Sequence, residues 1–299
     1  MKELGTRTVL DGLVFPEGIR WHAGLIWFSD ILDFKVWTYD PRAGTGAVFA
    51  ELPVRPSGLG FTPAGDLLVA AWERELIRLG PDGPQTVARL DTFGAQLNDM
   101  VVDRGGRAYI DYYAGDPIKD TFAGTRKGGL LAVEPDGTAR IVDDAMTAPN
   151  GMAITPDGKA LLVNDHGRIW KYDIRPDGDL ANRREFAPLA GDGLCLDAEG
   201  AVWIGASSGG SPAFTRVVEG GDVTHRVRVA GENIHTIAPV LGGPDRRTLY
   251  GTVSRWRLAD LLDAIGDIVV PRRAPGLRDR VKGLIVMAEG IEAPGAGIP

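Results

Sequence analysis

The sequence contains very little cysteine: Cys195 is the only one among its 299 residues. A single cysteine cannot form an intramolecular disulfide, and it cannot supply a metal site built from several thiolates. Any metal site in this chain must therefore rely mainly on oxygen or nitrogen ligands.

Long hydrophobic runs are also absent. No stretch of about 18 apolar residues occurs, so the sequence predicts no membrane-spanning helix. The first 20 residues include Glu3, Asp11 and Glu17, and they lack the basic start and apolar centre of a signal peptide. We therefore expect a cytoplasmic protein that does not contact a membrane.

An excess of positive charge is missing as well. Forty acidic residues against 33 basic ones give a net charge of −7, which provides no general attraction to phosphate backbones. The chain also lacks a GKS/T phosphate loop and a Gly-x-Gly-x-x-Gly turn between a strand and a helix. We therefore do not expect nucleic acid as a partner, and we expect a small-molecule substrate instead. The sequence carries no indication of oligomeric state.

Glycine is abundant, with 41 residues, and together with 20 prolines it interrupts many short apolar runs. Five segments share one template, in which a polar residue leads into an apolar run, a glycine turn and a second apolar run. The leading residues are Glu17, Ser57, Asn98, Asn150 and Asp192, with a weaker sixth copy at His235. Successive leading residues are 40 to 52 positions apart, close to the length of a four-stranded propeller blade.

This repeat predicts an all-β fold, a six-bladed β-propeller with four-stranded blades. Helical periodicity is nearly absent, and only Leu258–Ile265 looks helical. Residues 8–15 and 284–291 are both strand-like, and a ring closed by pairing the N- and C-terminal strands would leave no open edge. No linker interrupts the pattern, so we expect a single propeller domain over residues 1–299.

Equivalent positions of a propeller surround one central axis, so the six leading residues are predicted to form a ring. Buried charges without partners are unfavourable. A divalent cation held by oxygens of Glu17, Asn150 and Asp192 would remove that cost, while the alternative is a ring joined by hydrogen bonds alone. Oxygen ligands favour Ca²⁺, which we expect first, or Mg²⁺ or Mn²⁺, although Zn²⁺ also binds carboxylates.

Three protein ligands leave positions open on a cation for water and for a substrate oxygen, as Lewis-acid catalysis requires. Asn98 is a candidate for binding the substrate or the metal, and Asp99 for orienting that amide or accepting a proton. His235 would either face the cavity or be a structural histidine. Trp72 and the pair Tyr112–Tyr113 follow the second strands of their repeats and are candidates for the pocket wall.

The ring residues belong to longer motifs that are spread over nearly the whole chain. They are Phe15-Pro16-Glu17-Gly18, Leu97-Asn98-Asp99, Ala148-Pro149-Asn150-Gly151-Met152-Ala153, Gly191-Asp192-Gly193-Leu194-Cys195-Leu196-Asp197 and the tail Pro294-Gly295-Ala296-Gly297-Ile298-Pro299. Together they resemble the gluconolactonase, senescence-marker-protein and luciferin-regenerating-enzyme family. The resemblance implies a six-bladed propeller that hydrolyses lactones with one divalent cation, held by Glu17, Asn150 and Asp192. It also implies that Asn98 contacts substrate or metal and that Asp192 acts as a general base.

Two positions depart from the pattern of family members that act on sugar lactones. Those members often carry an arginine two residues before the Asn-Asp pair, where this chain has Gln96, and a glycine after the pair, where this chain has Met100. We treat both positions as substrate-binding candidates. With Ile19, Leu97 and Trp72 also near ring positions, we expect a pocket less polar than a sugar site, suited to a more apolar lactone or ester.

The favoured hypothesis is a metal-dependent lactonase-type hydrolase. The cation would polarise the carbonyl group, Asp192 or Asp99 would assist the attack of water, and Asn98 would stabilise the oxyanion. One alternative uses the same metal site for ester or organophosphate hydrolysis, or for an isomerase or dehydratase step. Another alternative is a noncatalytic binding propeller that its metal stabilises.

Overall fold

A computed structural model of the chain describes most of the sequence. The described residues are 1–94, 96–115, 120, 125, 127–189, 191–206, 211–257, 259–260 and 276–297. Apart from residues 259–260, the predicted helix Leu258–Ile265 lies outside them, and so do the last two residues of the tail motif.

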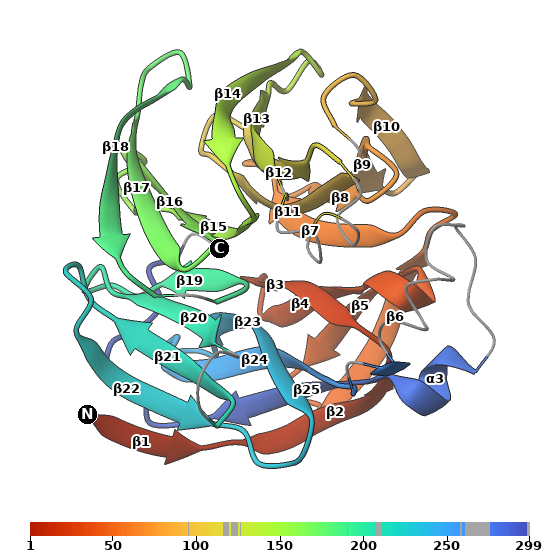
Figure 1. Ribbon diagram of the computed structural model, residues 1–299. Helices are drawn as coiled ribbons and strands as arrows, with labels where there is room; N and C mark the ends of the chain where they lie inside the picture. Colours follow the sequence, from red (N-terminus) through yellow and green to blue (C-terminus); the bar gives the residue numbers. More distant parts are fainter. Residues whose placement is uncertain are drawn as a thin grey trace.

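Six sheets surround a common centre and form the six-bladed, four-stranded propeller that the repeat predicts (Figure 1). Blade 1 contains β3 (Pro16–His22), β4 (Leu25–Asp30), β5 (Lys35–Asp40) and β6 (Thr45–Glu51). Blade 2 contains β7 (Pro56–Phe61), β8 (Leu67–Ala71), β9 (Glu75–Gly80) and β10 (Gly83–Arg89). Blade 3 contains β11 (Gln96–Val102), β12 (Ala108–Tyr113), β13 (Gly128–Val133) and β14 (Ala139–Met146).

The other three blades continue around the ring in chain order. Blade 4 contains β15 (Pro149–Ile154), β16 (Ala160–Asp165), β17 (Arg168–Ile174) and β18 (Leu180–Ala187). Blade 5 contains β19 (Leu194–Leu196), β20 (Val202–Ala206), β21 (Ala213–Val217) and β22 (Val223–Arg228). Blade 6 contains β23 (Ile234–Gly242), β24 (Thr248–Arg255), β25 (Lys282–Ala288) and β2 (Arg7–Leu13).

The ring is closed by the predicted pairing of the two chain ends. Strand β2 pairs antiparallel with β25, so the last blade takes its outer strand from the N-terminus. A second connection was not predicted: β1 (Lys2–Gly5) pairs parallel with β22 and adds a fifth strand to blade 5. The first 13 residues therefore join blades 5 and 6 along their outer edges (Figure 1).

Six clusters of buried side chains fill the spaces between neighbouring blades. Between blades 2 and 3, for example, Leu68 and Ala70 pack with Leu97 and Met100. A seventh cluster lies where the first strands of the blades begin, which we call the entrance side. It contains Val14, Ile31, Leu32, Leu277 and Val281, with Phe15, Trp72 and Trp256 packed against it.

Helical structure is sparse in the described parts of the chain. The two helical elements with defined bounds are the single turn η1 (Ile31–Asp33) and the short helix α3 (Leu277–Arg280), which lies beside blade 6 on the entrance side (Figure 1). Neither element has the length and apolar character that a membrane-spanning helix needs.

The first strand of a blade is irregular at the same place in five blades. A β-bulge turns side chains away from the regular alternation of a strand, and bulges are frequent beside functional sites. The register shifts at Glu17/Arg20, Pro56/Leu59, Leu97/Met100, Pro149/Met152 and Thr236/Pro239. The ring positions of these blades lie within the shifted stretches or directly beside them, so the irregularity changes the direction of the side chains that the repeat singles out.

We expect the two N-terminal strands to contribute unequally to stability. Deleting residues 2–5 removes only the fifth strand of blade 5, so the protein should keep a single cooperative thermal transition at a lower Tm. Deleting residues 2–13 also uncovers the edge of β25, and an exposed edge promotes association. That protein should lose its cooperative transition or aggregate, as calorimetry and light scattering would show. Equal Tm values for both truncations would contradict this account of ring closure.

Candidate active site

Backbone packing brings the ring positions of adjacent blades side by side. A Cβ atom placed on Gly18 would lie 2.4 Å from the carbonyl oxygen of Ser57, and one on Gly151 would lie 2.5 Å from Cα of Gly193. A Cβ on Gly193 would in turn lie 2.3 Å from Cβ of Ala238. Contacts this short accommodate only glycine, which explains the glycine that follows several ring residues. The ring residues of blades 1 and 2 are therefore neighbours, as are those of blades 4 and 5.

The carboxylates of the ring share one electrostatic environment. Glu17 is 8% exposed, and burial raises the pKa of its carboxyl group well above the usual range. The negative charges of Asp192, Asp99 and Asp111 raise this pKa further, while a 3.2 Å hydrogen bond from the Gly18 N–H opposes the shift. Acidic side chains from blades 1, 3 and 5 thus influence one another in the interior of the propeller.

Carboxylates at the ends of two second strands order the loops that lead into ring positions. Asp30, at the end of β4, accepts the backbone N–H groups of residues 14 and 15 at 2.9 and 2.7 Å. Asp165, at the end of β16, accepts those of residues 147 and 148 at 3.0 and 2.7 Å. Each loop reaches the ring residue of its blade two residues later, so these bonds fix the approach to Glu17 and Asn150.

Backbone hydrogen bonds within blade 5 and to blade 6 hold the segment around Asp192. The N–H of Asp192 donates to the carbonyl oxygen of Gly205 in blade 5 at 2.8 Å, and the N–H of Gly193 donates to the carbonyl oxygen of Ile237 in blade 6 at 3.0 Å. The side chain of Asn164 in blade 4 donates to the carbonyl oxygen of Gly191. Sequence reasoning did not single out Asn164, although a polar residue directly after the buried apolar run of β16 is a signal for such a role.

Asn98 is enclosed by hydrogen bonds that define which way its amide points. The nitrogen Nδ2 donates to Oδ2 of Asp111 and to the hydroxyl of Tyr113, both at 3.3 Å, while Oδ1 accepts from the hydroxyl of Ser57 at 3.2 Å. An ionised carboxylate can only accept, so Asp111 requires the nitrogen on its side. The carbonyl oxygen of Asn98 consequently faces the ring position of blade 2.

Two charged residues of this site were missed by sequence reasoning. Asp111 is fully buried, and it also accepts the backbone N–H of Asp99. Arg20 is 4% exposed; it pairs with Asp99 Oδ1 at 3.1 Å and donates to the carbonyl oxygens of Ile19 and Met100. Each is flanked in the sequence by apolar residues of a largely buried strand, which is the signal that could have revealed them.

The other substrate-binding candidates lie in different surroundings. Met100 is fully buried in the cluster between blades 2 and 3. Gln96 is half-buried at the start of β11, opposite Tyr113. Trp72 packs against the seventh cluster, with the guanidinium of Arg55 5.0 Å from its ring centre.

His235 is half-buried, and its ring stacks on Trp256 with centroids 3.6 Å apart and an interplanar angle of 4°. Burial lowers the pKa of this histidine, and the bond between its Nε2 and the carbonyl oxygen of Trp256 opposes the shift more weakly. A lowered pKa favours a neutral ring at pH 7. His235 and Trp256 therefore form an uncharged aromatic wall beside the ring.

The chemistry of the donor set suits a hard divalent cation. Within the described residues, no three His, Cys, Asp or Glu side chains group closely enough to form a metal site by themselves. The candidate set contains only two such side chains, Glu17 and Asp192, because its third member, Asn150, is an amide. Two carboxylates and an amide oxygen are ligands that Ca²⁺ accepts, and the raised pKa of Glu17 reflects a site that a cation would stabilise.

A family model described as the SMP-30/Gluconolactonase/LRE-like region matches residues 15–255. The chain belongs to this family. Similar proteins include a 6-deoxy-6-sulfogluconolactonase from Pseudomonas putida, 27% identical, and a regucalcin from Xenopus laevis, 28% identical, each alignment covering 77% of this chain and 79% of the relative. A solved structure of regucalcin from Agrobacterium tumefaciens is 21% identical, with a TM-score of 0.75 and coverage of 100% of this chain and 98% of its own.

All six ring positions lie inside the region that matches the SMP-30/gluconolactonase family. Strands β1, β2 and β25 and helix α3 lie wholly outside it. The match therefore covers the ring, while the strands that close the propeller and helix α3 lie outside it.

We expect the effects of Arg20 and Asp99 on the free energy of unfolding to be strongly coupled. Removing one partner of a buried ion pair typically lowers the free energy of unfolding by about 3–5 kcal/mol, because the other charge stays buried alone. Arg20→Met and Asp99→Asn should each have this effect in denaturant unfolding, and the double variant should lose much less than the sum. The exposed pair Arg42–Asp40, mutated in the same way, should show no coupling. Additive losses for Arg20 and Asp99 would contradict the interpretation.

Proposed function

We propose that this protein is a divalent-cation-dependent lactonase whose cation is held by Glu17, Asn150 and Asp192. The observation that carries the proposal is the buried, mutually repelling set of carboxylates around Glu17, in a chain that belongs to the SMP-30/gluconolactonase family. The names of two relatives support lactone hydrolysis: the Pseudomonas 6-deoxy-6-sulfogluconolactonase and a gluconolactonase from Zymomonas mobilis, 24% identical over 66% of this chain. The Agrobacterium regucalcin, described as a calcium-binding protein, supports the cation.

A bound divalent cation supplies Lewis-acid polarisation of the lactone carbonyl group. Proton transfer from the attacking water falls to a carboxylate within the ring. Asp192 suits this role better than Asp99, because Oδ1 of Asp99 already pairs with Arg20 and accepts the N–H of Met100 at 2.7 Å. Hydrolysis opens the lactone and gives a hydroxy acid.

Asn98 contributes its carbonyl oxygen in this scheme. Both hydrogens of its amide are directed to Asp111 and Tyr113, which leaves no N–H for an oxyanion. The oxygen has a second lone pair, which can accept from a substrate hydroxyl or a water or can bind the cation. The role of oxyanion donor that the sequence suggested for Asn98 is therefore not the one that the hydrogen bonds favour.

The ligand assignment predicts a shared loss of cation and activity. Glu17→Gln and Asp192→Asn keep the size of each side chain and remove one charge, so cation content by elemental analysis should fall and turnover should drop at least about 100-fold. Glu75→Gln, a carboxylate on the outer strand pair of blade 2 that binds Arg89, is the control and should change neither. Full metal-dependent turnover by either ring variant would refute the assignment.

The substrate class is tested with purified protein on lactones, aryl esters and phosphotriesters. Each is assayed with a chelator and after Ca²⁺, Mg²⁺, Mn²⁺ or Zn²⁺ is returned. Lactone turnover that the chelator abolishes is expected. Turnover of phosphotriesters alone would reject lactone hydrolysis, and a chelator that lowers Tm without any substrate being turned over would indicate a binding propeller.

The orientation of Asn98 gives a separate prediction. In Asp111→Asn the new amide can still accept the N–H of Asp99, but its own nitrogen would then face Nδ2 of Asn98. Asn98 must rotate, so kcat/KM should fall about 10- to 100-fold, while Tm should not fall because a buried negative charge is removed. Unchanged kcat/KM would show that the direction of the amide does not matter.

A further inference from the structure

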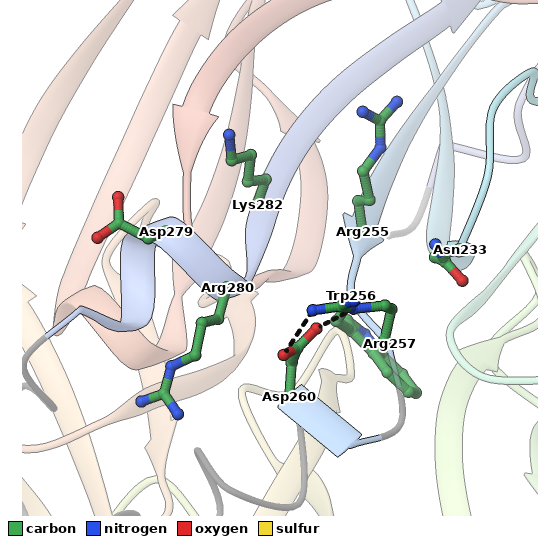
Figure 2. Close-up of a pocket in the computed structure, with 8 residues that line it drawn as sticks. All are labelled: Asn233, Arg255, Trp256, Arg257, Asp260, Asp279, Arg280 and Lys282. Carbon is green, nitrogen blue, oxygen red and sulfur yellow. Dashed lines mark hydrogen bonds and ion pairs between the residues drawn. The ribbon is translucent and has the colours of Figure 1, made fainter.

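A basic cavity lies on the entrance side, next to the ring, in a protein whose net charge is −7. Its volume is about 230 Å³, and it lies at the ends of β24 and β25 (Figure 2). Four basic side chains line it against two acidic ones: Arg255, Arg257, Arg280 and Lys282 against Asp260 and Asp279. The cavity is therefore locally basic in a protein that is acidic as a whole.

Two of these cationic side chains lie next to each other on paired strands. Arg255 and Lys282 are direct partners in the antiparallel pair of β24 and β25, and both are exposed. Figure 2 shows their charged ends extending in the same direction from adjacent strands. Like charges directly opposite each other in a sheet are destabilising. Neither residue takes part in an ion pair with the described residues, whereas Arg257 binds Asp260 at 2.6 Å, so the Arg255–Lys282 pair is the part of the cavity open to an anion.

Two contacts place the cavity beside the ring. Trp256 lines the cavity and stacks on His235, so one aromatic wall separates the cavity from a ring position. On the other strand, Gly283 follows Lys282 and packs so closely on Pro16 that an added Cβ would lie 2.3 Å from its Cδ. Pro16 directly precedes Glu17 in the chain. A ligand that spans the aromatic wall would thus contact both regions.

We propose that this cavity binds an anionic group carried by the substrate, such as a carboxylate, sulfonate or phosphate, and that it selects lactones bearing such a group. This inference rests on the proposed lactone hydrolysis. Guanidinium and ammonium groups bind these oxyanions through charge-assisted hydrogen bonds. The lactone carbonyl group has to lie at the ring residues for hydrolysis, so the two regions together orient the substrate, with its anionic group on the outer side of Trp256 and its lactone ring toward the ring residues.

The test compares two lactones of the same skeleton, one neutral and one carrying a carboxylate. In Arg255→Gln/Lys282→Gln, the KM for the anionic lactone should rise at least about tenfold, with kcat and the KM for the neutral lactone unchanged. Arg255→Lys/Lys282→Arg retains both charges and should restore most of the affinity. The control Arg42→Gln/Arg89→Gln removes two exposed cations from blades 1 and 2 and should change neither KM. Equal effects on both lactones, or no effect, would overturn the proposal.

Direct binding separates this proposal from the proposed function. Methylphosphonate is titrated calorimetrically into the cation-loaded wild type and the Arg255→Gln/Lys282→Gln variant. Binding that the variant loses supports an anion site in the cavity even if no lactone is turned over, in which case lactone hydrolysis alone fails. Binding that the variant retains overturns the anion site. Binding lost together with an unchanged KM for the anionic lactone would identify a site for free anions and overturn the role in substrate selection.

Discussion

The structure depends on holding several carboxylates close together among the innermost strands of the propeller. Tight packing at Gly18, Gly151 and Gly193 brings the blades together, and the register of the first strands shifts at the ring positions. Burial and mutual repulsion raise the pKa of Glu17. The protein balances one of these charges internally, through the pair of Arg20 with Asp99. In the proposed function a divalent cation would balance the others and would also polarise the lactone carbonyl group.

The architecture could be predicted because a propeller repeats its local pattern. Polar residues at intervals of 40 to 52 positions located the first strands, and the strand-like chain ends indicated closure by β2 and β25. Strand β1 was not predictable in the same way. It is only four residues long, and its partner, β22, lies more than 200 positions away, so nothing near it in the sequence marks the pairing.

The polar network around Asn98 was beyond sequence reasoning for a different reason. The sequence identifies Asn98 as a site candidate, but whether its oxygen or its nitrogen faces the ring depends on Asp111, which is 13 positions further on in the next strand. Asp111 and Arg20 are each flanked by apolar residues in largely buried strands. A charged residue in such a strand shows that a partner must exist, because an unpaired buried charge is too unfavourable. Which residue is the partner follows only from the fold.

The charged residues of the entrance side come both from the region that matches the family model and from the segment after it. The region that matches the family model ends at residue 255 and contains the ring, with its carboxylates and Asn150. Lys282 and Arg280 come from the segment after it, which also supplies β25. The strand that closes the ring thus brings Lys282 to the rim of an acidic centre, and helix α3 just before it brings Arg280. Because the stability of the ring depends on pairing along β25 and much less on the exposed residue at its first position, that position can change its charge without opening the propeller. If Lys282 and its neighbour Arg255 bind the anionic group of the substrate as proposed, substitutions there would change substrate preference and leave the ring residues as they are.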